Sequence, residues 1–264
     1  MVQAIFFDID GTLVSFKTKS IPAAVKEAIH RIRQKGIKIV ISTGRSPFDI
    51  KYVEDIEFDG FITANGAFCI DSKGEIIAQQ PVSKESLERL GVFIRKKPFP
   101  CSFMTNKGNY VNYIDDMMLS LSQLVNIPLP PVKPIAEILE HAIFQIDAFI
   151  ELNLETELLN HVLTDCIACR WHPYFADFNS ANCSKATGMD RFMTYFGMEH
   201  GQTMAFGDGG NDISMLKNAT IGIAMGNAKD NVKAVADYVT SSVDEDGIIN
   251  ALKHFNVIGI EELT

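Results

Sequence analysis

The sequence lacks any long hydrophobic run. Its longest apolar stretches fall far short of the roughly 18 residues that a membrane-spanning helix needs. The opening residues, MVQAIFFDID, contain no basic stretch and reach carboxylates almost at once, so we do not expect them to act as a signal peptide. No internal repeat or low-complexity segment is evident. These absences argue against a membrane protein and against a repeat architecture.

Positive charge is also scarce. The chain has 24 Lys and Arg residues against 33 Asp and Glu residues, a formal net charge of −9, and no block of five like charges. An acidic, evenly spread surface argues against nucleic acid and anionic membranes as partners. A small anionic substrate stays possible, provided that its site carries positive charge or a metal.

Cysteine is sparse and shows no disulfide or zinc pattern. The five cysteines are odd in number and scattered, and no second Cys-x-x-Cys or nearby His pair completes a zinc site around Cys166 and Cys169. We expect them to be buried thiols of a protein in a reducing compartment, which makes the cytoplasm the expected location.

The two ends of the 264-residue chain alternate short β-branched or aromatic runs with helical patterns. Such alternation predicts a doubly wound α/β sheet of mainly parallel strands. The expected strands are Val2–Phe7, Ile37–Ser42, Phe61–Ala64, Thr203–Phe206 and Ile221–Met225. The expected helices are Pro22–Gln34, Lys185–Phe196, Asn211–Lys217, Lys229–Ala236 and Asp246–Phe255.

The middle of the chain has a different order. After a hairpin around Asp71–Gly74, the pattern predicts paired strands with separate helices, which is typical of an α+β unit. The expected helices are 84–96, 116–125 and 154–165, and the expected strands are 101–104, 110–113, 143–150, 167–171 and 174–178, with a proline-rich joint at 128–134. We therefore expect a core domain of residues 1–82 and 183–264 and an inserted domain of residues 83–182.

Two acidic, glycine-rich segments follow predicted strands. Asp8-Ile-Asp10-Gly11-Thr12 comes directly after the first strand, and Gly207-Asp208-Gly209-Gly210-Asn211-Asp212 comes after another. In an open parallel sheet both lie at the carboxyl edge, where ligands bind. Holding carboxylates close together is costly unless a cation or a shared proton relieves their repulsion, and hard oxygen ligands suit Mg²⁺. The sequence thus predicts a Mg²⁺ site.

Two further segments suit a phosphate. Ser42-Thr43-Gly44-Arg45 ends a strand with hydroxyl groups and a glycine, and such groups with backbone N–H donors can hold a phosphate. Lys185 lies at the start of a predicted helix, where the helix dipole gives a cation no benefit, so a role facing an anion fits.

In this order the four segments resemble the motifs of the haloacid dehalogenase superfamily of phosphohydrolases. The first is DxDGT, the second ends at Thr43, the third is Lys185, and the fourth is GDGxND. The insertion between the second and third motifs resembles the type 2B cap of the Cof-type subfamily, as does Asn65-Gly-Ala after the third strand. One departure is Gly210, where many Cof-like members have Glu; we expect it to change local acidity near the metal and not the reaction.

The resemblance implies roles for these residues. Asp8 is expected to be the nucleophile that forms an aspartyl-phosphate, and Asp10 the general acid and base. Mg²⁺ is expected to be held by the Asp8 side chain, the Asp10 carbonyl and Asp208. Asp212 is expected to position either the water molecules around the metal or Lys185. The residues expected to contact the phosphoryl group or substrate are Thr43, Gly44, Arg45, Asn65, Lys185 and Asn211. For Arg45, fixing its loop is an equal alternative. For Asn65 a simple turn role is favoured over substrate contact, because Asn-Gly is a strong turn signal.

The function that this resemblance implies is Mg²⁺-dependent hydrolysis of small phosphate monoesters, hexose and pentose phosphates first. Alternatives are a phosphomutase, a phosphatase dedicated to a vitamin precursor, and a non-enzymatic phospho-ligand sensor, against which the intact Asp8 argues. A dinucleotide-binding domain is disfavoured because no GxGxxG opens the first helix. We expect a monomer or weak homodimer with a small phosphate ester as its partner.

Overall fold

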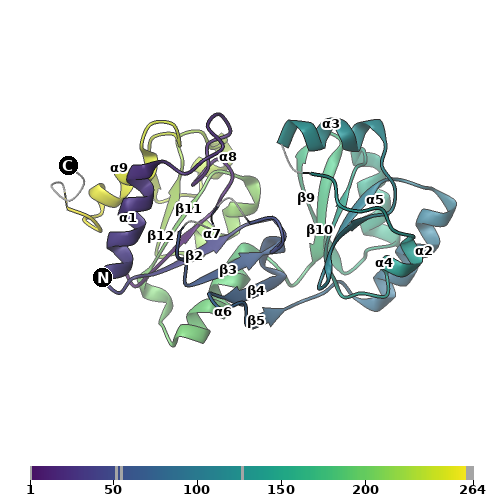
Figure 1. The fold of residues 1–264 in the computed structure, drawn as a ribbon, viewed down its shortest axis with the longest axis horizontal. Coiled ribbons are helices and arrows are strands. Elements are labelled where there is room, and N and C mark those ends of the chain that lie inside the picture. The colour runs from purple at the N-terminus through teal and green to yellow at the C-terminus, as the bar shows by residue number, and fades with distance from the viewer. Residues whose placement is uncertain (1, 51–52, 54–55, 126–127, 260–264) are drawn as a thin grey trace. The chain divides into compact units, whose positions relative to one another are not determined.

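A computed structural model describes residues 2–50, 53, 56–125 and 128–259. The contacts divide the chain into two compact units. Met1–Ala78 and Ser184–Thr264 form the first unit, and Gln79–Cys183 forms the second. Each unit is built around its own β-sheet (Figure 1).

The first unit contains a mostly parallel sheet. Its strands pair in parallel from one edge through to β3, and β4 then pairs antiparallel with β3. In spatial order they are β13 (Tyr238–Val239), β12 (Ile221–Ala224), β11 (Thr203–Gly207), β1 (Ala4–Phe7), β2 (Lys38–Ser42), β3 (Gly60–Thr63), β4 (Phe68–Asp71) and β5 (Ile76–Gln79). Because β1 and β11 are adjacent, the two acidic segments that follow them emerge side by side.

Helices cover both faces of this sheet, which makes it doubly wound. The helices of this unit are α1 (Ala23–Gln34), α6 (Lys185–Phe196), α7 (Ile213–Asn218), α8 (Asp230–Lys233) and α9 (Gly247–His254), with 3-10 turns η2 (Ala64–Gly66), η3 (His200–Gln202) and η4 (Gly210–Asp212). Helices α1 and α9 share one core with Ile5 and Phe7, whereas α6 and α7 share another with Ala4 and Phe6. The side chains of successive β1 residues therefore pack into the cores on opposite faces of the sheet.

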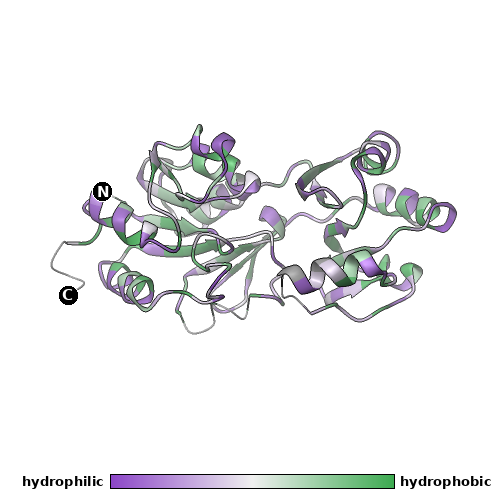
Figure 2. Cartoon of the chain, turned by 90° about the horizontal axis from the view of Figure 1, so that it is seen from above, coloured by the Kyte–Doolittle hydropathy of each residue, from purple (hydrophilic) through white to green (hydrophobic). Residues whose placement is uncertain are grey.

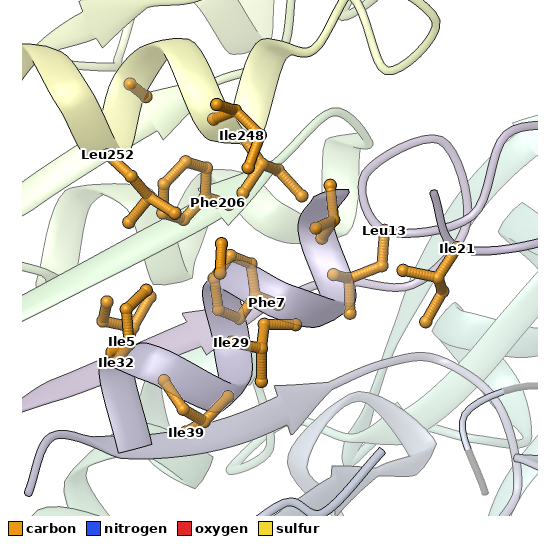
Figure 3. Close-up of a cluster of buried hydrophobic side chains, with 14 of the residues drawn as sticks. Ile5, Phe7, Leu13, Ile21, Ile29, Ile32, Ile39, Phe206, Ile248 and Leu252 are labelled. Carbon is orange, nitrogen blue, oxygen red and sulfur yellow. The ribbon is translucent and has the colours of Figure 1, made fainter. Parts of the chain in front are cut away.

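The core on the α1 and α9 side is built from aliphatic and aromatic side chains (Figure 3). Phe7 and Phe206, from adjacent strands, stack with their ring centroids 4.8 Å apart. Ile29 of α1 and Leu252 of α9 are fully buried against them. Burying such side chains contributes about 1.5–3 kcal/mol each, so this packing fixes the strands that carry the acidic segments.

The second unit contains an antiparallel five-stranded sheet. Its strands lie in the order β7 (Gly108–Val111), β6 (Cys101–Thr105), β8 (Ile143–Ala148), β10 (Phe175–Ser180) and β9 (Cys166–His172). Its helices are α2 (Lys84–Lys96), α3 (Asp116–Val125), α4 (Ile135–Ile138) and α5 (Leu152–His161). The apolar faces of α2, α4 and α5 pack on alternate strand residues such as Phe103 and Ile146. Coloured by hydropathy, helices of both units carry hydrophilic as well as hydrophobic residues (Figure 2).

The predicted fold class is confirmed: a doubly wound α/β core sheet and a separate α+β unit. The differences are local. The predicted helix Lys229–Ala236 is confined to Asp230–Lys233, and the predicted helix Asn211–Lys217 starts as a 3-10 turn before α7. The proline-rich joint is followed by the short helix α4, which the prediction missed; Pro134 occupies its N-cap, where the fixed φ of proline favours a helix start.

Within the described part of the chain, no helix is both long and apolar enough to cross a membrane.

Candidate functional site

The polar segments singled out in the sequence meet at the carboxyl edge of the parallel sheet. Asp8 follows β1, Thr43 follows β2, the η2 turn follows β3, and Asp208 follows β11. These strands are parallel neighbours, so their ends lie at one edge, the usual place for a ligand in an open α/β sheet.

Lys185 links two carboxylates at the centre of this edge. Its Nζ donates to Asp8 Oδ1 and to Asp212 Oδ1, each at 2.6 Å, and its side chain is wholly buried. Asp8 is 6% exposed, and its Oδ2 has no hydrogen-bond partner among the described residues. One oxygen of Asp8 is thus held in place while the other is available to react.

The first residue of α6 is Lys185, and a capping box at Ser184 fixes the start of this helix. Ser184 caps the helix by accepting from the Thr187 amide at 3.1 Å, and the Thr187 hydroxyl accepts from the Ser184 amide at 3.0 Å. Gly66 of η2 lies against this cap: a Cβ there would be 2.1 Å from the Ser184 carbonyl oxygen, and its φ is +96°. Only glycine fits both requirements, so η2 and the Lys185 helix are held in close contact.

Burial and neighbouring charges shift the pKa values of Asp8 and Lys185. Burial, followed by the Asp212 carboxylate, raises the pKa of Asp8 well above its ordinary value, although Lys185 opposes the shift. Burial alone would lower the pKa of Lys185, but Asp212 and Asp8 together raise it above the ordinary value. Lys185 therefore stays an ammonium, while Asp8 lies where negative charge is costly.

Asp208 and Asp212 complete the acidic cluster. Asp212 Oδ2 accepts from the amides of Asp208 and Gly209 at 3.0 and 2.8 Å, which closes the loop after β11. One oxygen from each of Asp8, Asp208 and Asp212 lies within 4.8 Å of the other two. Burial and then Asp212 raise the pKa of Asp208 to about 7.

This donor set fits a divalent cation. The oxygens are hard ligands of the type that Mg²⁺ prefers, and Lys185 supplies one positive charge against three carboxylates. Burial, and after it the Asp212 carboxylate, raises the pKa values of Asp8 and Asp208, and a bound cation would offset the cost of ionising them. Asp212 accepts three hydrogen bonds, from the Lys185 ammonium and two backbone amides, whereas Asp208 accepts two and Asp8 accepts one. Asp8 and Asp208 are therefore the better direct ligands.

Asp10 points to a different partner. Its carboxylate accepts two hydrogen bonds from Arg45, from Nε at 2.7 Å and from Nη2 at 2.6 Å. The Arg45 amide donates to Thr43 Oγ1 at 3.1 Å, and Thr43 is almost fully buried. Arg45 therefore connects the loop after β2 to the loop after β1, and both roles expected for it stay predictions.

Gly44, Asn65 and Asn211 lie together. Asn211 Nδ2 donates to Asn65 Oδ1 at 2.9 Å, and a Cβ on Gly44 would be 3.2 Å from the same Asn65 oxygen. Asn65 and Ala64 have φ values of 53° and 48°, a left-handed turn that is costly for residues other than glycine. The structure thus brings together these three predicted phosphate-binding residues from three different loops.

Comparison with known proteins identifies the family. Residues 5–252 match the family model of the haloacid dehalogenase-like hydrolases. The chain belongs to this family.

Two relatives and one solved structure show which members of the family this chain is similar to. YkrA of Bacillus subtilis (strain 168), a candidate phosphatase, is 30% identical over 97% of this chain and 98% of its own. YcsE of the same organism, a 5-amino-6-(5-phospho-D-ribitylamino)uracil phosphatase, is 28% identical over 96% of each chain. The structure of BT4131, a subclass IIB sugar phosphatase, superimposes with a TM-score of 0.90 at 40% identity, covering 97% of this chain and 100% of that one.

These findings confirm the predicted family and the type 2B resemblance, and the prediction of a phosphatase agrees with the names of the relatives. The roles of individual residues in this haloacid dehalogenase-like hydrolase stay predictions.

Two site residues escaped the sequence reasoning. Thr12, the last residue of the DxDGT segment, donates from Oγ1 to Asp208 Oδ1 at 3.2 Å, a contact that the motif did not predict. Asn227, which lies outside the four motif segments, donates from Nδ2 to Asp208 Oδ2 at 3.1 Å. It follows β12, so the rule that polar residues after parallel strands gather at the carboxyl edge would have found it.

Proposed function

We propose that this protein is a Mg²⁺-dependent phosphatase of small phosphate monoesters, with sugar phosphates as its main substrate class. The observation that carries the proposal is the arrangement of Asp8, with one oxygen held by Lys185 and the other unpartnered at the carboxyl edge. A buried carboxylate with a fixed orientation suits a nucleophile.

In the proposed reaction, Asp8 Oδ2 attacks phosphorus. The new O–P bond forms as the bond between phosphorus and the leaving alcohol oxygen breaks, which gives an aspartyl-phosphate. Asp10 delivers a proton to that oxygen and then takes one from the water that attacks phosphorus, releasing phosphate and restoring Asp8. One Asp10 oxygen can carry this proton when one of the two hydrogen bonds from Arg45 opens, while the other hydrogen bond keeps the carboxyl group in place.

Asp8, Asp208 and the main-chain carbonyl of Asp10 would hold the cation. When bound, Mg²⁺ reduces the repulsion between an anionic nucleophile and a dianionic ester. Lys185 and the loop amides that Asp212 fixes keep the two ligand carboxylates in position. Asp212 acts on the site through Lys185 and these amides.

The remaining polar groups would bind the phosphoryl oxygens. The proposed donors are the Thr43 hydroxyl, the Gly44 amide, Lys185 and Asn211, which stabilise charge as phosphorus changes partners. Asn65 would orient the Asn211 amide by accepting its hydrogen bond, and direct substrate contact is proposed for Asn65 as well. Arg45 would contact the anionic substrate while it keeps one hydrogen bond to Asp10.

The likeness to the sugar phosphatase BT4131 supports the substrate class. The likeness to YcsE favours a phosphorylated vitamin precursor as a second candidate. We also propose that residues 83–182 form the cap that selects the leaving group. The protein is proposed to work as a monomer or weak homodimer in the cytoplasm, a location with which its thiols are compatible.

The test is phosphate release from a panel of monoesters, with and without Mg²⁺. The panel contains hexose and pentose phosphates, a phosphorylated ribitylamino-uracil, a nucleotide and an aryl phosphate. Wild-type turnover should need Mg²⁺ and should vanish in Asp8→Asn. Glu57→Gln, the same chemical change at a side chain that is 87% exposed, should keep full activity.

Two results would point elsewhere. Turnover of no ester by folded protein would overturn the phosphatase proposal and leave a phospho-ligand sensor. A marked response to added sugar bisphosphate would indicate a phosphomutase, because a mutase returns the phosphoryl group to a second hydroxyl.

A further inference from the structure

Asn227 ties together three loops at the carboxyl edge of the core sheet. It lies in the segment after β12. Its Nδ2 donates to the Gly11 carbonyl at 2.9 Å and to Asp208 Oδ2 at 3.1 Å, and its Oδ1 accepts from the Val243 amide at 2.9 Å. One amide side chain thus connects the loops after β1, β11 and β13.

The Asp208 carboxylate is oriented from both of its ends. Thr12 donates to Oδ1, and Asn227 donates to Oδ2. Gly11 also leaves no room beside this carboxylate, since a Cβ added to it would lie 2.3 Å from Asp208 Oδ2. Because Asn227 also holds the Gly11 carbonyl, it sets the distance between the Asp10–Thr12 turn and Asp208.

We propose that Asn227 is a positioning residue that orients Asp208, and with it the Gly11 turn, for a divalent cation. The inference rests on the proposed function, in which Asp208 and the neighbouring Asp10 carbonyl are cation ligands. Residues that hydrogen-bond metal ligands fix their direction, and their loss typically weakens metal binding by about 10–100-fold. An amide suits this place because its NH₂ group donates twice while its oxygen accepts once.

The chain offers a matched control in Asn250. Its Nδ2 donates to Ser241 Oγ at 2.8 Å and to the Glu245 carbonyl at 3.1 Å, so it braces the same loop after β13. Asn250 has no hydrogen bond to Asp208 or Gly11 among the described residues. Asn227→Ala and Asn250→Ala therefore remove the same side chain, but only one of them releases Asp208.

The experiment titrates Mg²⁺ alone into each protein and follows both the binding heat and the melting temperature. Asn227→Ala should raise the Mg²⁺ dissociation constant by about 10–100-fold, and Asn250→Ala should change it less than twofold. Asn227→Leu, which keeps much of the volume, should behave like Asn227→Ala. Saturating Mg²⁺ should restore most of the kcat of both Asn227 variants, because a positioning defect leaves the ligands in place.

Several results would overturn the inference. Mg²⁺ affinity in folded Asn227→Ala within twofold of wild type would refute it and leave the proposed function intact. An equal loss in Asn250→Ala would assign the effect to loop order and not to Asn227. No Mg²⁺ binding by the wild type would overturn the metal-dependent function itself, and the inference with it.

Discussion

The guanidinium of Arg45 donates two hydrogen bonds, of 2.6 and 2.7 Å, to the two carboxylate oxygens of Asp10. Arg45 has a 12% exposed side chain and Asp10 a 35% exposed one. Bidentate pairs of this kind fix the direction of a carboxylate as well as its charge. In the proposed reaction Asp10 protonates the leaving oxygen, so Arg45 positions the carboxyl group that donates this proton.

Replacing Arg45 should therefore harm some substrates more than others. Arg45→Ala should lower kcat/KM for a sugar phosphate by at least about 100-fold, within the usual range for acid–base catalysis. The loss for an aryl phosphate should be several-fold smaller, since its leaving group needs less protonation. Steady-state assays on both esters give the comparison; equal losses would mean that Arg45 acts only by binding phosphate.

Removing the ammonium of Lys185 should cost both activity and stability. Lys185→Met leaves the buried Asp8 and Asp212 without their shared counter-charge. We expect unfolding free energy to fall by about 3–5 kcal/mol in urea with EDTA, and kcat to fall by at least about 100-fold. Lys217→Met, at an exposed position of α7, should do neither. Unchanged urea stability of Lys185→Met would contradict the importance of this buried pair.

The sequence predicted what depends on neighbouring residues along the chain. Helix α6 begins and ends as expected because Ser184 caps it and Gly197 ends it in a left-handed conformation, with φ of 65°. The order of the strands and the edge at which the acidic segments meet follow from hydrophobic runs and from the rules for parallel sheets.

Contacts between distant loops could not be predicted in the same way. That Arg45 reaches Asp10, and that Asn211 reaches Asn65, depends on distances between the ends of separate strands. Local patterns leave those distances open. The same reason explains why Asn227, which joins three loops, was missed.

Gly11 should be irreplaceable for a reason beyond its backbone angle. Its φ is +85°, and a Cβ would lie 2.3 Å from Asp208 Oδ2. Gly36 has a similar φ of +81° with nothing within 4 Å of such a Cβ. Both alanine variants should lose about 1–2 kcal/mol of stability through the left-handed conformation, but only Gly11→Ala should also lose Mg²⁺ binding and activity. Urea unfolding and a Mg²⁺ titration separate the two effects, and equal behaviour of the two variants would rule out the steric argument.

The stability of the metal-free protein should depend on pH through Asp208. Its pKa is about 7 in the folded protein against 3.8 ordinarily, so between these values the folded state holds a proton that the unfolded state has lost. Stability therefore falls as the pH rises through this interval. Asp208→Asn has no titratable group at this position. In EDTA the melting temperature of Asp208→Asn minus that of the wild type should therefore increase from pH 5 to pH 8.

With Mg²⁺ present, raising the pH should favour the wild type over Asp208→Asn, the opposite of the trend in EDTA. A cation bound to ionised Asp208 competes with the proton, so the increase in melting temperature that Mg²⁺ gives the wild type should grow from pH 5 to pH 8. Asp208→Asn should gain little at any pH, and it should be the less stable protein at pH 8 with Mg²⁺. If the two proteins shared one pH profile in EDTA, burial of the Asp208 carboxylate would carry no cost. Its place in the acidic cluster would then need no cation to explain it.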